Sequence, residues 1–459
     1  MQNLPTPALG RMAAAMSAVL LAGCASLSPD GGLNDVSRLT RERIGQPAAF
    51  TKQTAQEDGA GNAQVQSLLS QPLSADTAVQ IALLNSPALK ASLAELGLSE
   101  AEFVQAGRLR NPSFGFSRVR GGNDKEIERS ISFDLAGLLT LPARHRIEQG
   151  RFEQAKLQAA LQAVRLAADT RRAYYMAVAA AQSAAFAEQV RGAAEASAML
   201  AANMAKVGNW SKLDQARERA FHQDAMTQLA RTRHAAAASR EKLIRLLGLW
   251  GEQQNFSLPD RLPDLPAQPQ EPGNAEARAL SQRLDVLAAR RDVDATASAL
   301  GLTKASRFFN VFDAGYTNKS STGAPRGNGY EISLELPLFD WGGANVARAE
   351  ALYMQAVHRT ADTAVRARSE VREAYSAYRT TYDIARHYRD DVVPLRKQIS
   401  DEVMLRYNGM LASVFELLAD SREQLASVNA AIDSQRDFWI AESELHSAIN
   451  GGGNNEPRN

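Results

Sequence analysis

The sequence predicts a mainly helical chain built from two tandem repeats, each combining a β-hairpin with very long helices. The first observation is an internal match, because Ile131–Leu135 precedes Ile332–Leu336 by about 200 positions. Arg172–Tyr175 precedes Arg372–Tyr375 at almost the same spacing. The second observation is composition: aromatic residues make up only 6% of the 459 residues, and alanine, glutamine, arginine and glutamate fill long stretches, as is typical of extended helices.

The third observation is a pair of strand-like runs in each repeat. Phe114 and Phe116 alternate with small or polar residues, and Tyr330, Ile332 and Leu334 do the same. The predicted strands are Ser113–Arg120 and Arg129–Ala136 in the first repeat, and Phe308–Thr317 and Tyr330–Leu338 in the second. With flanking residues each run reaches about ten residues, the length of a tilted membrane strand. Small soluble sheets show the same alternation, so that alternative stays open.

A helix of unusual length is predicted after each hairpin. Residues 142–205 contain no proline after Pro142, which suits the first position of a helix. The second long helix is expected from Gly343 to about Tyr407, with a kink at Pro394. About 64 residues would span about 95 Å, which is too long for an ordinary globule. Shorter helices are expected to lie end to end beside the long ones, at 73–110, 208–247, 276–306 and 411–448.

The number of strands implies an oligomer. Four strands cannot close a transmembrane barrel, and an open sheet edge in lipid leaves backbone groups without partners. Closure needs about eight strands or more, so at least two chains must contribute. Three chains would supply about twelve strands and leave a wider lumen, which favours a trimer.

The first residues resemble an export signal of the lipoprotein type. Arg11 precedes the apolar run Met12–Ala22, which is too short to span a bilayer. The run ends in Leu21-Ala22-Gly23-Cys24, which resembles a bacterial lipobox. That resemblance implies that Cys24, the single cysteine of the chain, becomes the mature N-terminus and carries several acyl chains, enough for stable anchoring. An ordinary signal peptide with an incidental cysteine is the alternative. No aspartate follows Cys24 directly, which favours an outer-membrane address.

The composition argues against most other classes of protein. Lys and Arg number 52 against 51 Asp and Glu, a formal net charge of +1, so a nucleic-acid partner is not expected. The six histidines and the cysteine show no metal-ligand spacing, and no Walker loop, GxGxxG turn or HExxH helix occurs. We therefore expect no catalytic residue, no metal site, no enzymatic activity and no cofactor other than the lipid on Cys24.

Several local patterns add a family resemblance. They are Gly107–Pro112, Leu336–Gly343 and Arg406–Gly409, in addition to the lipobox and the repeat. With them the chain resembles the TolC-like outer membrane factor family, also called outer membrane efflux proteins, over essentially all of its mature length. The resemblance implies a homotrimer, a shared 12-stranded β-barrel in the outer membrane, and long coiled helices that form an α-barrel through the periplasm. It also implies a periplasmic adaptor (membrane fusion) protein and an inner-membrane pump of the RND type.

Two alternatives to this interpretation stay open. The sequences of two segments, Asn85–Leu89 and Phe133–Leu139, most resemble heavy-metal resistance-type efflux members. This resemblance suggests metal cations as cargo. A drug-efflux or type I secretion exit duct is the alternative within the class. A structural periplasmic coiled-coil lipoprotein without a pore is the alternative from a different class.

The resemblance divides the chain into six parts. They are a lipoprotein signal peptide (1–23), a lipidated N-terminal extension (24–70), a first efflux repeat (71–248), a proline-rich equatorial linker (249–275), a second efflux repeat (276–450) and a flexible tail (451–459). Residues 28–70, rich in Gly, Asn, Gln and Ser, are interpreted as peripheral or flexible.

The candidate functional residues lie at the two predicted helical turns. Glycine allows the backbone to reverse there, and the resemblance implies that these tips dock the adaptor. The docking candidates are Val207, Gly208, Asn209, Tyr407, Asn408 and Gly409. The resemblance also implies that acidic residues just beyond the turns narrow the periplasmic entrance, where a ring of carboxylates would select cations. The candidates for this aperture are Asp214, Glu416 and Asp420, together with Arg217. Arg217 and Arg406 are expected to form ion pairs across helices. A solvated helix face is the alternative for the acidic residues.

Overall fold

The computed structural model describes residues 26–52, 55–271, 273–308 and 311–451, so Cys24 lies outside the described residues. The chain forms two compact units. The first, which we call the sheet unit, contains the residues up to Val36, Leu93–Ala159 and Asp285–Ala364. The second, which we call the tip unit, contains Ser37–Ser92, Ala160–Leu284 and the residues from Val365 onward. Both repeats therefore contribute to both units.

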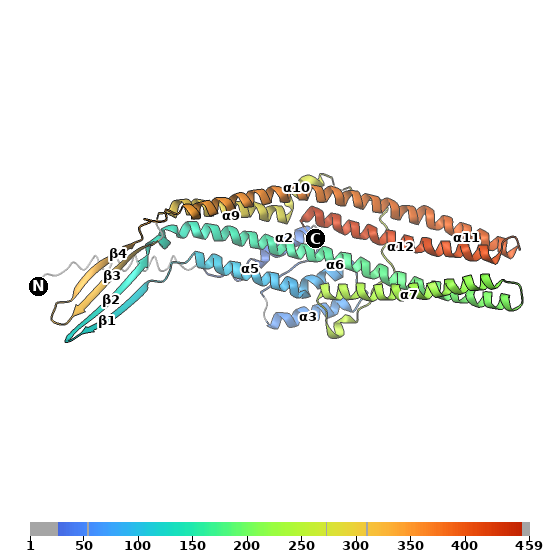
Figure 1. The fold of residues 1–459 in the computed structure, drawn as a ribbon, viewed down its shortest axis with the longest axis horizontal. Coiled ribbons are helices and arrows are strands. Elements are labelled where there is room, and N and C mark those ends of the chain that lie inside the picture. The colour runs from blue at the N-terminus through green and yellow to red at the C-terminus, as the bar shows by residue number, and fades with distance from the viewer. Residues whose placement is uncertain (1–25, 53–54, 272, 309–310, 452–459) are drawn as a thin grey trace. The chain divides into compact units, whose positions relative to one another are not determined.

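Both predicted hairpins form, and they join in one antiparallel sheet of order β1-β2-β3-β4 (Figure 1). The strands are β1 (Ser113–Gly121), β2 (Asp124–Asp134), β3 (Phe312–Ser321) and β4 (Gly327–Leu334). Phe114, Ile131, Tyr316 and Tyr330 are paired in a row across the four strands, so aromatic and β-branched side chains pack beside one another. Strands β1 and β4 are the outer strands of the sheet.

Several predicted strand bounds are wrong. The third strand is predicted over Phe308–Thr317, but β3 is Phe312–Ser321. The second strand is predicted to begin at Arg129, but β2 begins at Asp124, after a turn in which Gly122 has φ +61°. Charged residues in this part of β2 interrupt the hydrophobic alternation by which a strand is predicted. The backbone nevertheless pairs with β1 in continuous register. The fourth strand is predicted to reach Leu338 but ends at Leu334. The Leu338 N–H donates to the Leu336 carbonyl at 2.8 Å, a tight turn that takes the backbone off the sheet.

The first long helix, α6, starts earlier than predicted, because it runs from Leu135 to Lys206. The Gly137 N–H donates to Asp134 Oδ1 at 2.6 Å, so the last residue of β2 caps the helix and leaves no room for a loop. Pro142 therefore lies inside the helix and not at its first position. Arg144 Nη2 donates to the Gly137 carbonyl at 2.9 Å, which supplies a side-chain partner in this first part of the helix.

The second long helix is interrupted just before the predicted kink. It consists of α10 (Gly343–His387), a π-helical turn (Tyr388–Val392) and α11 (Val393–Asn408). Pro394 lies in the first turn of α11. Proline has no N–H to donate to the carbonyl four residues earlier, and the Val393 N–H donates to the Tyr388 carbonyl, five residues earlier. The hydrogen-bond ladder thus slips by one residue at the proline.

The return helices are α7 (Lys212–Leu247) and α12 (Val414–Asn450). The two helices predicted at 73–110 and 276–306 are each divided in two. The resulting elements are α4 (Ala75–Asn85), α5 (Pro87–Ala106), α8 (Ala275–Gln282) and α9 (Leu284–Ser306). Ser86 is extended because a residue before proline avoids the helical region.

Arg283, at the other break, is extended for a tertiary reason. Its side chain is only 2% exposed. Its guanidinium pairs with Glu370 Oε2 at 2.7 Å and donates to the Ala448 carbonyl at 2.9 Å. These partners lie far from Arg283 in the sequence, so no local pattern marks the break.

The interpretation of residues 28–70 as peripheral or flexible is wrong for much of this segment. It forms α2 (Leu33–Ile44) and α3 (Ala55–Leu69). Val36 and Thr40 are fully buried in α2, and Val65 of α3 is 1% exposed. The apolar residues of α2 recur at helical spacing, but they are few. The polar composition of the segment therefore led to the wrong prediction.

The tip unit has a core in which α4, α6 and α7 meet. Ile81, Val178 and Leu247 are fully buried in one cluster, and the Tyr174 hydroxyl donates to the Leu73 carbonyl at 3.0 Å. The proline-rich segment contributes Leu262 to this cluster. None of the helices in the described ranges has an apolar stretch long enough to cross a bilayer.

Candidate functional site at the helical turns and the sheet

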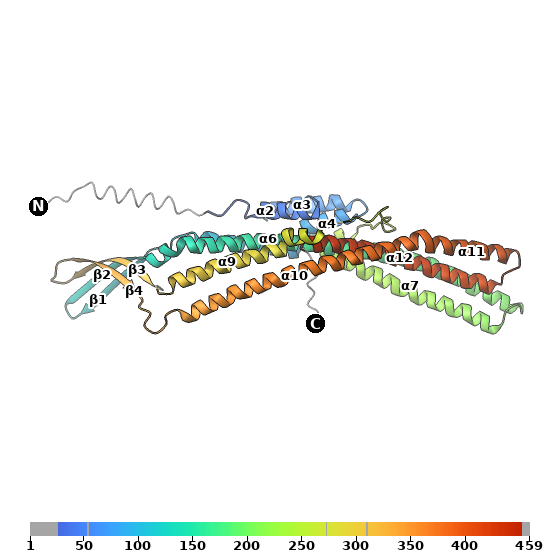
Figure 2. The ribbon, with the colours of Figure 1, turned by 90° about the horizontal axis from the view of Figure 1, so that it is seen from above.

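The tip unit contains two helical hairpins, α6–α7 and α11–α12, and each ends in a turn (Figures 1 and 2). The two turns have the same backbone hydrogen bond. After α6, the Asn209 N–H donates to the Met204 carbonyl at 2.9 Å. After α11, the Leu411 N–H donates to the Arg406 carbonyl at 2.8 Å. Each is the longer of the two hydrogen bonds of a Schellman motif. That motif needs one residue of the turn in the left-handed conformation.

The left-handed residue differs between the two turns. It is Gly208 in the first turn, with φ +77°, and Met410 in the second, with φ +59°. The docking candidates Gly208 and Gly409 therefore do not occupy equivalent positions, because Gly409 has φ −81°. A comparison of residue types pairs glycine with glycine, whereas the backbone places a methionine in the conformation that glycine adopts without strain.

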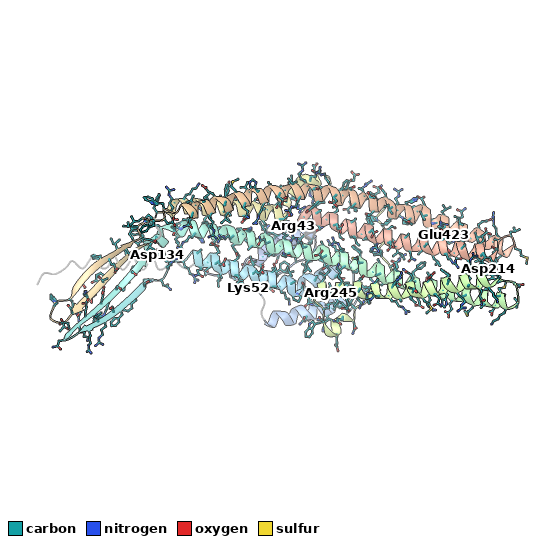
Figure 3. All side chains as sticks on the ribbon, in the orientation of Figure 1. Arg43, Lys52, Asp134, Asp214, Arg245 and Glu423 are labelled. Atoms are coloured by element: carbon teal, nitrogen blue, oxygen red, sulfur yellow. The ribbon has the colours of Figure 1, made fainter. Side chains whose placement is uncertain are left out.

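This shift brings the predicted acidic residues into register. Asp214 lies six residues after Gly208, and Glu416 lies six residues after Met410. In α7 the Asp214 N–H donates to Ser211 Oγ at 3.1 Å, and Ser211 Oγ donates to Asp214 Oδ2 at 2.6 Å. In α12 the Glu416 N–H donates to Ser413 Oγ at 3.2 Å. Asp214 and Glu416 thus occupy the same position of two capped helices, where a negative charge is favourable. Figure 3 shows Asp214 near its turn.

The predicted ion pairs of Arg217 and Arg406 across helices are wrong within the described chain. Arg217 pairs with Asp214 Oδ1 at 3.4 Å and Arg406 pairs with Glu402 Oε1 at 3.2 Å, each within its own helix. Side chains three or four residues apart on a helix already lie side by side. A local partner is therefore available before any partner on another helix.

Other residues join the two helical hairpins, α6–α7 and α11–α12, and no sequence motif predicts these contacts. The rings of Trp210 and Phe415 stack with centroids 4.5 Å apart. Arg422 Nη2 pairs with Glu218 Oε1 at 2.8 Å, and Ser197 Oγ donates to Glu218 Oε2 at 2.6 Å. Glu218 is 3% exposed, so its charge is neutralised inside the tip unit. Arg422 and Glu218 lie far apart in the sequence, and no local motif connects them.

Asp420 and Glu218 occupy equivalent positions, since each lies seven residues after its capping serine. Asp420 is half-buried, and its Oδ2 atom has no hydrogen-bond partner within the described residues. Only Glu218 thus has an arginine from the other hairpin beside it.

The turns expose apolar side chains. Val207 is 69% exposed, Met410 94% and Leu411 82%. The docking candidates Gly208, Asn209, Asn408 and Gly409 are also exposed, and Tyr407 is half-buried. Exposed apolar residues grouped at one place are typical of a protein contact surface.

The sheet of the sheet unit has two chemically different faces. Strand pairing assigns alternate residues of each strand to opposite faces. One face carries Phe114, Phe116, Ile127, Ile131, Phe133, Phe312, Tyr316, Tyr330, Ile332 and Leu334. The other carries Ser117, Glu126, Glu128, Ser130, Ser132, Asp134, Thr317, Lys319, Glu331 and Ser333. Most of the apolar side chains are solvent-exposed, Tyr330 at 90% and Ile332 at 71%.

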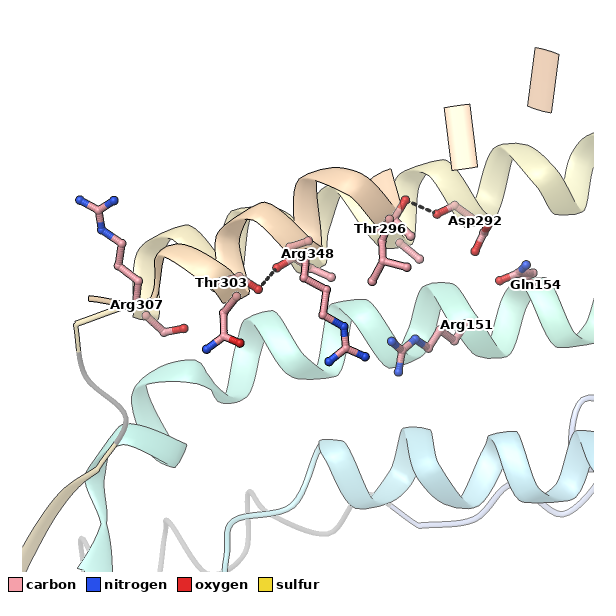
Figure 4. Close-up of a pocket in the computed structure, with 14 residues that line it drawn as sticks. Arg151, Gln154, Asp292, Thr296, Thr303, Arg307 and Arg348 are labelled. Carbon is pink, nitrogen blue, oxygen red and sulfur yellow. Dashed lines mark hydrogen bonds between the residues drawn. The ribbon is translucent and has the colours of Figure 1, made fainter. Parts of the chain in front are cut away.

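A polar cleft of about 550 Å³ lies among α6, α9 and α10 of the sheet unit (Figure 4). Arg151 of α6 and Arg348 of α10 extend into it, and Asp292 is the only carboxylate among the lining residues. The lining contains no histidine or cysteine. In the described ranges no group of three or more His, Cys, Asp and Glu residues could hold a metal ion.

Residues 277–451 match the sequence profile of the family described as "Outer membrane efflux protein". No curated protein matches the sequence significantly. A membrane protein from Pseudomonas aeruginosa is 20% identical, with TM-score 0.70 over 84% of this chain and 94% of that chain. VceC, an outer membrane protein of Vibrio cholerae, is 16% identical, with TM-score 0.69 over 85% and 97%. CusC, described as forming a transmembrane channel, is 18% identical, with TM-score 0.68 over 85% and 92%.

Residues 277–451 are therefore similar to the outer membrane efflux protein family, and the chain shares its fold with these three solved structures. The predicted fold class, long helices with a small antiparallel sheet, is confirmed, and the predicted family resemblance is matched by the profile over residues 277–451.

Proposed function

We propose that three copies of this chain form one duct through the outer membrane, the exit component of a tripartite efflux system. The observation that carries the proposal is the open sheet: four strands with two unpaired edges, one apolar face and one polar face. Unpaired strand edges are not tolerated in lipid. Joining β4 of one chain to β1 of the next removes every edge, and three chains give about twelve strands with a polar lumen.

The paired turns of the tip unit are the proposed docking surface for a periplasmic adaptor protein, which links the duct to an inner-membrane pump of the RND type. The exposed apolar residues Val207, Met410 and Leu411 support this role. Docking residues need to be accessible while the helices behind them stay rigid. The Trp210–Phe415 stack holds the two turns together directly behind the exposed residues.

Asp214 and Glu416 are proposed to line the aperture near these turns, with Asp420 and Arg217 beside them. Three chains would bring six such carboxylates near one axis, and a ring of carboxylates favours cations. This charge is compatible with metal cations as cargo, the heavy-metal type of efflux. A drug-efflux or type I secretion duct would use the same pore with another pump.

The lipid anchor is proposed at Cys24, after removal of residues 1–23 as a signal peptide. The support is the sequence Leu21-Ala22-Gly23-Cys24, which lies outside the described residues. Several acyl chains would tether the chain to the outer membrane independently of the barrel. Mass spectrometry of the mature N-terminus tests this: unmodified Cys24 in membrane-extracted protein would contradict it.

The test of the duct combines mass and conductance. The purified full-length protein in detergent is expected to have the mass of three chains by light scattering, and to conduct ions passively in planar bilayers. A monomer without conductance would contradict the duct and favour a structural lipoprotein without a pore. Co-purification with an adaptor, lost on substitution of Val207 and Leu411 by aspartate, tests the docking surface.

A further inference from the structure

Four cationic side chains gather on the apolar face of the sheet, near the turn of the first hairpin. We call Arg118, Arg120, Lys125 and Arg129 the basic cluster. Arg120 pairs directly with Lys125 across the two strands, and Arg129 pairs with Phe116. The cluster therefore lies on the same face as the apolar side chains, at the end of the sheet away from Asp134, where α6 begins (Figure 1).

The carboxylates of this hairpin lie on the opposite face. Glu126 and Glu128 alternate along β2 with Lys125 and Arg129, and Glu126 pairs with Lys319 of β3 on that other face. Arg129 Nη1 donates to Asn318 Oδ1 at 3.4 Å, which is a neutral partner. The structure gives Arg118, Arg120 and Lys125 no carboxylate partner among the described residues. Like charges opposite one another destabilise a strand pair, so the cluster is suited to an anion from outside the chain.

The surroundings of the cluster indicate the kind of anion. Phe114 is 69% exposed, Phe116 59% and Ile131 43%, and they continue the same face toward the helices. A ligand that covers both regions has a phosphate or similar anion next to apolar chains. Arginine binds phosphate with paired hydrogen bonds, and long cationic side chains can lie along apolar surface while their charge reaches the headgroups.

We propose that the basic cluster binds the phosphate groups of a lipid in the outer leaflet of the membrane. This inference rests on the proposed function, in which the apolar face contacts lipid and the hairpin turns lie at the outer surface. An anionic lipid that bridges Arg120 and Lys125 would relieve their repulsion. It would also pack against β1, which is the edge strand where two chains of the trimer meet.

The test uses purified full-length trimer and diphosphoryl lipid A, with enzymatically dephosphorylated lipid A and inorganic phosphate as comparisons. Binding is measured by native mass spectrometry and by the shift in melting temperature. Each cation near an anionic lipid surface contributes about fivefold in affinity. The variant Arg118→Gln, Arg120→Gln, Lys125→Gln is expected to bind diphosphoryl lipid A about 100-fold more weakly than the wild type.

Lys319→Gln is the matched control, because it removes one cation from the other face of the same part of the sheet. It is expected to bind lipid A as the wild type does. If the triple variant does not assemble, Arg120→Gln alone is used, with an expected loss of about fivefold.

Equal binding of phosphorylated and dephosphorylated lipid A, or an unchanged affinity in the variant, would overturn the proposal. Full competition by inorganic phosphate would show that the ligand is a free anion and overturn the lipid assignment. A trimer that conducts ions but does not discriminate between the lipids leaves the proposed function standing and removes this inference alone.

Discussion

At the scale of single residues, the acidic side chains near the turns have a local role before any role in a pore. Asp214 closes a hydrogen-bonded cap with Ser211, and Arg217 lies beside its other oxygen. A substitution that removes the side chain would therefore change both the helix end and the charge. A test of the aperture has to keep the cap and remove only the charge.

Asp214→Asn meets this requirement, because an amide oxygen can still accept a hydrogen bond. We expect a lower preference for cations over anions in planar bilayers, measured from reversal potentials in a salt gradient. Asp224→Asn is the control, since Asp224 is exposed on the same helix farther from the turn. Equal reversal potentials for the wild type and Asp214→Asn would remove Asp214 from the aperture.

Arg422 holds the buried carboxylate of Glu218. Arg422→Met is expected to destabilise the contact between hairpins by about 2 kcal/mol, because it leaves Glu218 buried without its cation. Hydrogen exchange of the amides in α7 and α12 near the turns should become faster. Adding Glu218→Gln should recover most of this loss. Arg396→Met, which breaks the more exposed pair with Glu423, should cost less than about 1 kcal/mol.

Glu442 gives a pH dependence. Burial raises the pKa of its carboxyl group, nearby Arg171 lowers it, and Asp76 raises it further, with a net increase. The folded state therefore binds this proton more tightly than the unfolded state, so stability falls as pH rises through the raised pKa. Glu442→Gln should raise the melting temperature at pH 7. It should have little effect below the ordinary pKa of glutamate, where the carboxyl is protonated in both states. An increase in melting temperature that is the same at both pH values would contradict this account.

At the scale of elements, the two turns place different residues at the same left-handed backbone position. Gly208 adopts its left-handed conformation freely and a Cβ added there would meet no atom within 4 Å. Met410 adopts the same conformation with a side chain, at a cost of about 1 kcal/mol. The exposed methionine therefore lowers the stability of the turn and places an apolar side chain at its surface.

Met410→Gly should thus stabilise the second turn by about 1 kcal/mol, and Gly208→Ala should destabilise the first by a similar amount. Hydrogen exchange of the amides of Asn209 and Leu411, which form the Schellman bonds, measures both effects. If Met410 also contacts the adaptor, Met410→Gly should weaken adaptor binding while it stabilises the turn. Slower exchange together with unchanged binding would exclude Met410 from the contact.

At the scale of the whole molecule, the chain has an incomplete sheet. A lone four-stranded sheet with an exposed aromatic face and two open edges would aggregate in water. In a closed barrel the same face contacts lipid and the same edges pair with other chains. The proposed oligomer would therefore satisfy both the backbone and the side chains of the sheet.

Ile332 and Ser333 are neighbours on β4 with opposite faces, which gives a matched pair of substitutions. Ile332→Lys would place a charge against lipid, at a cost of about 2–4 kcal/mol per chain near the middle of the bilayer. We expect much less assembled trimer in outer-membrane fractions, measured as the heat-modifiable band on gels. Ser333→Lys should assemble normally. Equal assembly of the two variants would show that the apolar face does not contact lipid.

The sequence by itself predicted the duplicated hairpin-and-helix unit, the fold class and the approximate position of the strands, because these depend on local periodicity and on matches between the two halves. It placed Asp214 and Glu416 near the turns, although the two candidate glycines, Gly208 and Gly409, do not occupy equivalent positions. A comparison of residue types cannot show which residue has a positive φ.

Only the tertiary structure decided the rest. The break at Arg283 exists because distant Glu370 and the Ala448 carbonyl hold its guanidinium, and the contact between hairpins exists because Arg422 meets Glu218. The alternation along β2 is visible in the sequence, but strand pairing places Arg118 and Arg120 on the same face as Lys125 and Arg129. Long-range contacts choose among conformations that local propensities leave nearly equal in free energy, so the sequence pattern alone cannot supply them.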